Sequence, residues 1–477
     1  MLSSSARYLT RACFSPLQCH KLVKYRLFHD VPLLDDLAYR GFIQDVTRPD
    51  ALRQALQSKP QAVYSGVDPT APSLHIGHLL PFMTLLHFQI RGHGIIPLIG
   101  GATGRVGDPS GRSTERTQAD IQQIEENVIK LTESIQSFFG RALDYAQKKL
   151  ETDGSPVLPL QNPSVLSNLV WHEKFSMLDF LRDVGKHVRV NTMLNRESVR
   201  ARLESQQGLS FTEFTYQLLQ AYDFYYLHKY HGCSIQVGGS DQWGNILAGL
   251  ELIGRYETHS AAAVVEPSAF GLTTPLLTTS TGEKFGKSAG NAVWLDPKLT
   301  SIFDFYQYFL KVTDDDVEKY LKLFTLLPRA TITELVQTHQ AAPEKRIAQR
   351  WLAAEVTELV HKRDGVIRAE TLTKTFFESD YEGLKAENVK SALEGDPRLV
   401  VLDPREIQGT PVAKLAAKYG LVASNSAAKN LIASRGLYLN NQVVPEAQYT
   451  VQNSSLIDGR VAILRAGKGK LLVIVAN

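Results

Sequence analysis

Three short apolar runs in this chain have the composition of β-strands. They are residues 62–68 (AVYSGVD), 94–101 (GIIPLIGG) and 233–245 (CSIQVGGSDQWGN). The first runs into a turn-forming stretch and then a helical pattern from His75, while the other two run into glycines. Strand, loop and helix in alternation predict βαβ units and a parallel sheet, an α/β fold. In such sheets, ligands bind at the carboxyl ends of the strands.

The apolar pattern changes after the second predicted strand. Residues 119–149 have the spacing of a long amphipathic helix. Residues 151–168 contain three prolines and a glycine, and predict a surface insertion. From residue 301 to 401 the pattern is helical and charged, with few strand signals. This segment predicts an α-helical domain.

The last part of the chain predicts a small separate module. Residues 402–411 (LDPREIQGTP) have the composition of a linker. Residues 412–477 predict two short helices, a turn at Asn440 and Asn441, and strands, which together form an α+β domain. At 477 residues the chain exceeds the ~250–300 residues of one hydrophobic core, so several domains are expected.

The first 29 residues have a composition of their own. They hold five Lys or Arg residues, several serines and no acidic residue. They lack the apolar stretch of ~7–15 residues that a secretory signal needs, so a mitochondrial transit peptide at 1–29 and a matrix location are predicted. The alternative is a disordered basic arm. Cys13, Cys19 and Cys233 are too few for a disulfide framework or a metal cluster, and no metal site is predicted.

Charge is distributed unevenly along the chain. The whole chain is +3, but residues 405–477 hold nine Lys or Arg residues against three acids. This concentration predicts a polyanionic partner for the C-terminal module. No apolar run reaches the ~18–20 residues of a membrane helix, so no membrane partner is expected.

Two short motifs suggest nucleotide chemistry. His75 and His78 enclose Gly77 at a predicted helix start, where unpaired backbone N–H groups favour an anion. Lys284 and Lys287 lie three apart in GEKFGKS, a glycine-containing loop that could follow charge on a departing pyrophosphate. Each motif alone is also compatible with an ordinary exposed loop or helix cap.

Together these motifs resemble a known family. HIGH (75–78) followed far downstream by KFGKS (284–288) is similar to the paired signatures of class I aminoacyl-tRNA synthetases. YSGVDPTAPSLHIGHL, GGATGRVGDPSGRSTERT, YQLLQAYD and QVGGSDQWGNI extend the likeness, and the chain resembles tyrosyl-tRNA synthetases, most closely a mitochondrial form. The resemblance covers nearly the whole chain beyond residue 29.

This resemblance implies a tyrosine–tRNA ligase with L-tyrosine, ATP and tRNA(Tyr) as partners. Mg²⁺ is expected with ATP, without a protein cage of its own. The implied organisation is a Rossmann-type catalytic domain at 30–300, an α-helical anticodon-binding domain at 301–401 and an S4-like RNA-binding domain at 412–477. The resemblance also implies a homodimer.

The tyrosine site can be argued partly from spacing. Tyr216, Gln220 and Asp223 lie at i, i+4 and i+7, on one face of a helix. A polar stripe there needs partners, which a bound amino acid would supply. The resemblance implies the following tyrosine-binding residues, with Tyr64 and Asp223 on the phenolic hydroxyl: Tyr64, Asp68, Asp108, Tyr216, Gln220, Asp223, Gln236 and Gln242.

The remaining site residues follow from the same resemblance. The implied ATP-binding residues are Gly66, Asp68, His75, Gly77, His78, Gly239, Asp241, Lys284, Phe285, Lys287 and Ser288. The implied catalytic residues are Thr70, His75, His78, Arg112, Arg116, Lys284 and Lys287. The candidate RNA contacts of the C-terminal module are Lys414, Lys418, Lys429, Arg435, Arg465, Lys468 and Lys470.

Three alternatives remain at this stage. A tryptophanyl-tRNA synthetase shares the fold but gives no reason for a hydroxyl-binding pair at Tyr64 and Asp223. A small HxGH nucleotidyltransferase would not need residues 301–477. An added role in binding structured intron RNA during splicing is compatible with intact synthetase motifs.

Overall fold

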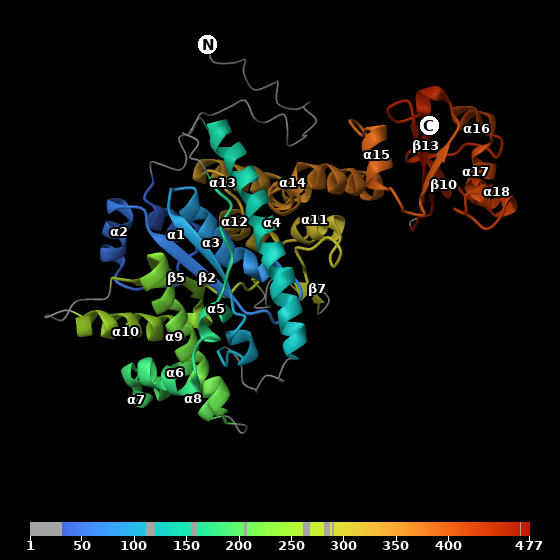
Figure 1. Cartoon of the computed structure of the whole chain (residues 1–477). Helices are drawn as coiled ribbons and strands as arrows, with labels where there is room; N and C mark the ends of the chain where they lie inside the picture. Colours follow the sequence, from blue (N-terminus) through green and yellow to red (C-terminus); the bar gives the residue numbers. More distant parts are fainter. Residues whose placement is uncertain are drawn as a thin grey trace, which may run out of the picture. The chain divides into compact units, whose positions relative to one another are not determined.

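The structure is a computed structural model (Figure 1), and it describes residues 31–110, 120–153, 160–204, 208–260, 268–280, 287–288, 291–467 and 469–477. The predicted transit peptide, Arg112, Arg116, Lys284, Phe285 and Lys468 lie outside the described residues. For Lys287 and Ser288 only the backbone is described. The chain forms two compact units, one holding the chain up to Thr300 with Tyr308–Val360, the other Ser301–Gln307 with His361–Asn477.

The first unit is built on a six-stranded sheet of order β1-β6-β5-β2-β3-β4. The strands are β1 (Asp45–Val46), β2 (Ala62–Val67), β3 (Gly94–Ile99), β4 (Leu166–Ser167), β5 (Cys233–Gly239) and β6 (Phe270–Thr274). Every pairing from β6 to β4 is parallel, and only the edge strand β1 runs antiparallel. The predicted α/β fold with a parallel core is confirmed.

Helices surround this sheet. Those assigned wholly to the first unit are α1 (Leu33–Arg40), α2 (Pro49–Ser58), α3 (Leu79–Gln89), α4 (Ile121–Asp153), α5 (Leu169–His172), α6 (Met177–Asp183), α7 (Val190–Leu194), α8 (Glu197–Leu203), α9 (Phe211–His231), α10 (Trp243–Ser260), α12 (Asp314–Phe324) and α13 (Arg329–Ala341). Helix α3 has no polar face, and all of its residues except Pro81 are buried. A helix that is apolar on every side belongs in the interior, and α3 packs against β2, β3, α1 and α12.

A buried ion cluster ties the N-terminal helix to later helices. The Asp36 carboxylate accepts from Arg40 at 3.1 Å and from Arg91 at 2.7 Å. Desolvation would raise the pKa of Asp36, but the neighbouring side chains of Arg40, His87 and Arg91 together hold that pKa well below its usual range. Arg40 also donates to the carbonyls of Thr325 and Leu327 at the end of α12. Every charge in the cluster is thus paired, as buried ions require.

The second unit contains a five-stranded sheet of order β11-β10-β12-β13-β9. Its strands are β9 (Leu399–Leu402), β10 (Leu437–Leu439), β11 (Gln442–Val443), β12 (Val461–Ala466) and β13 (Lys470–Ala476), and its helices are α15 (Ala386–Ala392), α16 (Pro404–Gly409), α17 (Val412–Lys418) and α18 (Asn425–Ala433). Asn440 and Asn441 both adopt positive φ between β10 and β11. Positive φ at both central residues is what a two-residue hairpin turn requires, which confirms the predicted turn.

The helical segment between these sheets does not form a unit of its own. Helices α11 (Ile302–Leu310) and α14 (Ile347–Phe377) are each divided between the two units, and α14 has a non-helical residue at Lys362. Residues 301–401 were expected to form one helical domain. The buried contacts of α12 with α1 and α3 explain why much of this segment belongs to the first unit.

Two boundary predictions differ from the structure. Residues 402–411 contain the end of β9 and helix α16, so they are part of the folded C-terminal module and not a linker. Strand β9 pairs in parallel with β13, a contact that the sequence pattern of 402–411 could not show. Residues 151–168, predicted as a surface insertion, include β4, which extends the central sheet beside β3. Among the described residues, no helix is long and apolar enough to span a bilayer.

Candidate active site

The predicted site residues of the first unit lie near the carboxyl ends of the parallel strands. Strands β2, β3 and β5 end at Val67, Ile99 and Gly239. The segments that follow these ends carry Asp68, Asp108 and Gln242, and all three side chains take part in the hydrogen bonds described below. Parallel sheets of this kind bind their ligands at the carboxyl ends of the strands.

The two histidines of the HIGH motif form a reciprocal hydrogen-bonded turn. His75 Nδ1 accepts the backbone N–H of Gly77 at 3.0 Å, and His78 Nδ1 accepts that of His75 at 3.1 Å. Since Nδ1 accepts in both rings, each neutral ring carries its proton on Nε2. A Cβ at Gly77 would lie 2.8 Å from the ring of His75, so only glycine fits beneath it. The turn (Ile76–His78) leads directly into α3.

Burial keeps His78 neutral. Desolvation of its ring, with a smaller contribution from His75, lowers the pKa of His78 to about 3. A neutral His78 can donate a hydrogen bond from Nε2, and its ring does not change protonation state near neutral pH. It would meet a phosphate oxygen as a fixed hydrogen-bond donor.

The lowered pKa of His78 predicts a loss of stability in acid. In the unfolded chain the ring takes up a proton below about pH 6.5, whereas the folded protein resists this until about pH 3. His78 therefore contributes full stability above pH 6.5 and loses it as the pH falls towards 3. Between pH 7.5 and pH 5, the free energy of unfolding should fall by about 1–2 kcal/mol more in the wild type than in His78→Asn. Urea unfolding at both pH values checks this, and equal pH dependence would contradict it.

The segment that follows the second motif is paired with the segment around the histidine turn. Ile76 donates its backbone N–H to the carbonyl of Val293, and Leu295 donates to that of Leu74. Strand β8 (Asn291–Ala292), just before Val293, pairs with β7 (Lys287–Ser288). The backbone of Lys287 therefore pairs with β8, and the residues directly after β8 pair with the segment around the histidine turn. The two motifs are about 200 residues apart in sequence.

The polar stripe of α9 faces the end of the sheet. Tyr216 donates its hydroxyl to Asp68 Oδ2 at 2.9 Å. Gln220 Nε2 donates to Gln242 Oε1 at 3.2 Å, and Gln242 Nε2 donates to Asp108 Oδ2 at 2.7 Å. Burial, and then the nearby carboxylates Asp68 and Asp108, raise the pKa of Tyr216 well above 10.0. The structure thus brings five of the eight predicted tyrosine-binding residues into two hydrogen-bonded groups, Tyr216 with Asp68, and Gln220 with Gln242 and Asp108. Each group contains a carboxylate, which suits an ammonium group.

Three polar side-chain atoms of the site are buried with no hydrogen-bond partner among the described residues. They are the Tyr64 hydroxyl and the Oε1 atoms of Gln220 and Gln236. Burial, and then the Asp223 carboxylate and Cys233, raise the pKa of Tyr64 well above 10.0. Buried polar atoms without partners are rare in folded proteins, and here all three belong to residues of the predicted tyrosine site. A polar ligand in this place would satisfy them.

Several residues of the site were not predicted from the sequence. Asn168 is fully buried, and its Nδ2 donates to Asp223 Oδ2 at 2.9 Å and to Thr103 Oγ1 at 3.0 Å. Thr103 in turn donates to Asp68, so Asn168 links the two carboxylates. A Cβ at Gly100 would lie 2.0 Å from Asp68 Oδ1, which requires glycine there. Gly100 and Thr103 lie in the glycine-rich GGATG stretch, whereas nothing in the sequence marked Asn168.

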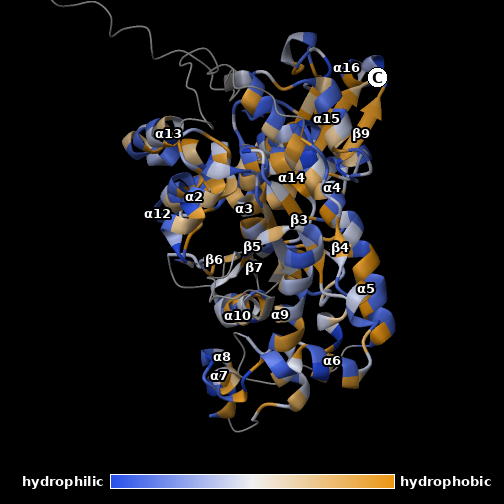
Figure 2. Cartoon of the chain, turned by 60° about the vertical axis from the view of Figure 1, so that its left-hand side comes forward, coloured by the Kyte–Doolittle hydropathy of each residue, from blue (hydrophilic) through white to orange (hydrophobic). Residues whose placement is uncertain are grey.

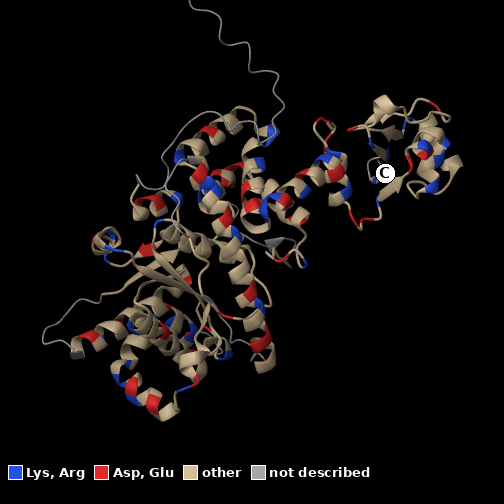
Figure 3. Cartoon of the chain, turned by 45° about the horizontal axis from the view of Figure 1, so that its top comes forward, with Lys and Arg blue, Asp and Glu red and all other residues tan. Residues whose placement is uncertain are grey.

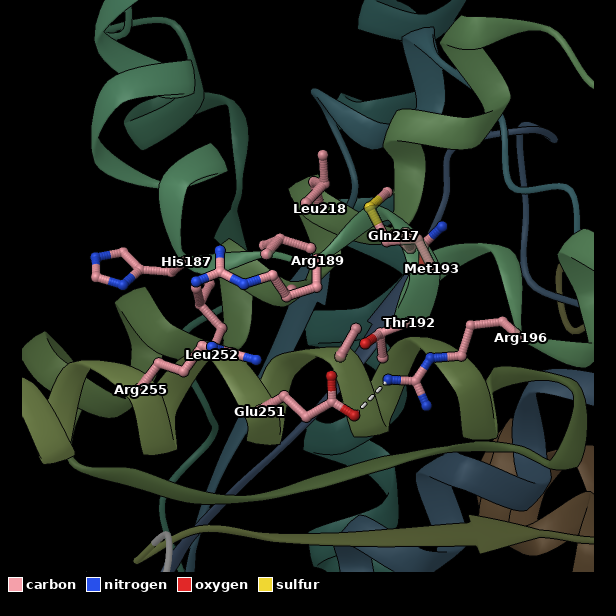
Figure 4. A pocket seen from close by; sticks show the side chains of 13 residues that line it. His187, Arg189, Thr192, Met193, Arg196, Gln217, Leu218, Glu251, Leu252 and Arg255 are labelled. Atoms are coloured by element: carbon pink, nitrogen blue, oxygen red, sulfur yellow. Dashed lines mark hydrogen bonds and ion pairs between the residues drawn. The ribbon is translucent and has the colours of Figure 1, made fainter. Parts of the chain in front are cut away.

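A separate pocket lies behind the stripe. It is lined from α9 by Gln217, Leu218 and Ala221, which alternate with the stripe residues (Figure 4). Across it, Arg196 and Glu251 form an ion pair at 2.8 Å. The pocket is therefore distinct from the network around Asp68 and Asp223.

The predicted RNA contacts in the second unit fall into two groups. Lys414, Lys429, Arg435 and Lys470 are exposed, and Figure 3 shows basic residues, in blue, on the helices of this module. Lys418 is exposed too, but it pairs with Glu406 at 2.6 Å, which raises the pKa of Lys418.

Arg465 differs from the other basic residues. Its guanidinium donates to the carbonyls of Thr375 and Phe376 at the end of α14, at 2.7 and 3.0 Å. These contacts favour a structural joint within the second unit over a phosphate contact.

The fold and the site define an α/β enzyme that binds a nucleotide beside a small polar ligand. The profile of the family "tRNA synthetases class I (W and Y)" matches residues 56–378, and the chain belongs to this family. It is 40% identical to the mitochondrial tyrosine–tRNA ligase of Saccharomyces cerevisiae, over 99% of this chain and 98% of that protein. It is 41% identical to tyrosine–tRNA ligase 1 of Bacillus subtilis, over 93% and 99%.

Solved structures give the same result. A C-terminally truncated mitochondrial tyrosyl-tRNA synthetase of Aspergillus nidulans matches with a TM-score of 0.63 and 38% identity. The match covers 72% of this chain and 94% of that one.

Proposed function

We propose that this protein is a tyrosine–tRNA ligase that activates L-tyrosine with ATP and transfers it to the 3′ end of tRNA(Tyr). The observation that carries the amino-acid choice is the buried, unpartnered hydroxyl of Tyr64 near the Asp223 carboxylate. A phenolic hydroxyl can accept from Tyr64 and donate to Asp223. Tryptophan has no hydroxyl at this place and phenylalanine has no polar group there. ATP–pyrophosphate exchange with tyrosine, phenylalanine and tryptophan tests this choice.

Activation requires no protein nucleophile. The tyrosine carboxylate attacks the α-phosphorus of ATP, a carboxylate–phosphorus bond forms, and pyrophosphate leaves with the electron pair of the broken bond. The protein then has to position both substrates and stabilise charge. The proposed arrangement puts the α-ammonium near Asp68, Asp108 and Tyr216, and the phosphates near Thr70 and the histidine turn.

The nucleotide contacts form a second part of the proposal. Gly66, Gly239 and Asp241 lie at or just after the ends of β2 and β5, where the ribose would bind. Mg²⁺ would enter with the ATP phosphates, and it would supply charge neutralisation there. Arg112, Arg116, Lys284 and Lys287 are the proposed cations around the pyrophosphate.

Lys287 should act chiefly on the transition state. Charge moves onto pyrophosphate as the bond to the α-phosphorus breaks, so a cation on this loop is worth most at that moment. Lys287→Ala should lower the rate of adenylate formation by about 100-fold and change tyrosine affinity by less than about twofold. Single-turnover kinetics and equilibrium tyrosine binding measure the two quantities. An equal loss in both would show that the loop only binds substrate.

Tyr64 should contribute to the choice between tyrosine and phenylalanine. Tyr64→Phe removes one neutral hydrogen bond to the substrate hydroxyl and keeps the ring contact with Phe224. A neutral hydrogen bond is worth about 0.5–1.5 kcal/mol, so the tyrosine/phenylalanine ratio of kcat/KM should fall by about 2- to 13-fold. Pyrophosphate exchange with each amino acid measures this ratio. An unchanged ratio would show that Tyr64 does not bind the hydroxyl of the substrate.

The C-terminal module is proposed to hold tRNA through phosphate contacts. Its exposed basic residues are Lys414, Lys418, Lys429, Arg435 and Lys470. Phosphate contacts supply much of nucleic-acid affinity. The anticodon is proposed to meet the helices between residues 301 and 401.

A homodimer is the proposed assembly. Large apolar side chains are exposed on the helices between β4 and α9, including Met177 at 71%, Leu178 at 78% and Val190 at 59%. Figure 2 shows apolar segments, in orange, on the ribbons of these helices. Apolar surface of this kind marks association sites. Sedimentation velocity should show a dimer that Leu178→Asp weakens, and a monomeric wild type at micromolar concentration would contradict the proposal.

The proposed location is the mitochondrial matrix. Support comes from the basic, acid-free first 29 residues and from the mitochondrial relatives. Residues 1–29 fused to a fluorescent protein should direct it to mitochondria. Retention of the fusion in the cytosol would contradict this location.

A further inference from the structure

The Asp223 carboxylate is held by a set of donors that no motif of the sequence had indicated. In the described part of the chain, Oδ1 accepts from Trp171 Nε1 at 2.8 Å and lies 2.7 Å from His172 Nε2. Oδ2 accepts from Asn168 Nδ2 at 2.9 Å. All three donors come from the segment after β4, and Asp223 is only 2% exposed. The carboxylate is therefore fixed from one side by a single short segment.

The two oxygens of Asp223 are not equivalent. A carboxylate oxygen has about two acceptor positions. On Oδ1 both are taken, by the indole and the imidazole. On Oδ2 only one is taken among the described residues, so the acceptor position left for a ligand is on Oδ2. A carboxylate only accepts hydrogen bonds, so His172 carries a proton on Nε2 in this contact.

His172 is well placed to hold this asymmetry. Its side chain is 7% exposed, and its ring packs edge-on against Tyr222 at 5.7 Å. The ring of Phe180 lies 6.4 Å from that of His172 and 6.3 Å from that of Tyr222. The aromatic neighbours fix the ring, and the ring in turn fixes Oδ1.

We propose that His172 is a specificity-determining positioning residue, which occupies Asp223 Oδ1 so that Oδ2 receives the hydroxyl of the substrate. This inference rests on the proposed tyrosine pocket. His172 does not touch the substrate in this arrangement. It acts through Asp223, and its effect should appear only with substrates that carry the hydroxyl.

The test compares three variants of the full-length protein by pyrophosphate exchange. His172→Phe keeps the ring packing and removes the donor. His172→Gln supplies a donor of similar reach. His228→Leu is the matched control, because His228 also contacts a carboxylate, Glu257 at 3.2 Å, on α9 but outside the Asp223 network.

The expected result is a selective loss with tyrosine. His172→Phe should raise KM for tyrosine roughly tenfold with little change in kcat, and leave phenylalanine nearly unaffected. The tyrosine/phenylalanine ratio should then fall roughly tenfold, His172→Gln should restore most of it, and His228→Leu should leave it unchanged.

Other outcomes would overturn the inference. An equal loss with both amino acids, or a glutamine variant no better than the phenylalanine variant, would show that His172 is only structural. If His172→Phe does not fold, His172→Leu takes its place in the same comparison. If the wild type shows no pyrophosphate exchange with tyrosine, the proposed function itself is refuted. That result differs from a failure of the His172 proposal alone.

Discussion

Replacing Asp223 with asparagine should lower kcat/KM for tyrosine by roughly 100-fold, which corresponds to about 3 kcal/mol. The substitution keeps the size of the side chain and removes its charge. One carboxylate oxygen becomes an NH₂ group, yet both oxygens face donors from Asn168, Trp171 and His172. A donor would then face a donor in a buried place, and the substrate hydroxyl would lose its charged acceptor.

The effect of Asp223→Asn should be specific to substrates with a hydroxyl. Activity with phenylalanine should change much less, because phenylalanine never uses the acceptor. Asp183→Asn is the matched control, since Asp183 is exposed and its carboxylate pairs with Arg182, away from the Asp223 network. A loss of less than about fivefold with tyrosine would show that Asp223 is not its main acceptor.

Removing the C-terminal module should separate the two half-reactions. The structure indicates where to cut, because the family match ends at residue 378 and α14 ends at Phe377. A cut near Pro404 would instead expose Leu384, Val389 and Leu393, because the residues of β12 and β13 against which they pack would be removed. The chain ending at Glu378 should keep pyrophosphate exchange within about twofold and lose tRNA charging by about 100-fold or more.

The reason is that the candidate RNA-binding residues all lie beyond the cut. The affinity for tRNA should fall, and its dependence on salt should become shallower by roughly 0.7–0.9 in log–log slope for each phosphate that the shortened chain no longer neutralises. A full-length variant with Lys414, Lys429, Arg435 and Lys470 changed to glutamine provides the folded control. Charging at the full-length rate by the truncated chain would leave the basic module without a tRNA role, and binding to structured intron RNA would become the better explanation.

The parts of the site predicted from the sequence are those that depend on local pattern. The ends of β2, β3 and β5 follow from apolar runs that stop at turn residues, and the stripe of Tyr216, Gln220 and Asp223 follows from helical spacing. The likeness to a known family then supplied roles for these residues.

Other features depend on contacts between distant segments, which a pattern does not contain. Asn168, Trp171 and His172 lie 55, 52 and 51 residues from Asp223 in sequence, and β4, which positions them, has only two residues. Likewise, a count of basic residues could not show that Arg465 donates its hydrogen bonds to the carbonyls at the end of α14.

The measurement that tests the central claim most directly is ATP–pyrophosphate exchange by the full-length protein with each of the twenty amino acids. The buried pair of Tyr64 and Asp223 predicts exchange with tyrosine and much weaker exchange with phenylalanine and tryptophan, because the polar groups of the pocket would be left unpaired. Strong discrimination against phenylalanine is a known property of tyrosyl-tRNA synthetases, and the expected size, at least about 1,000-fold in kcat/KM, is taken from that family. Exchange that prefers tryptophan, or no exchange with tyrosine, would contradict the assignment.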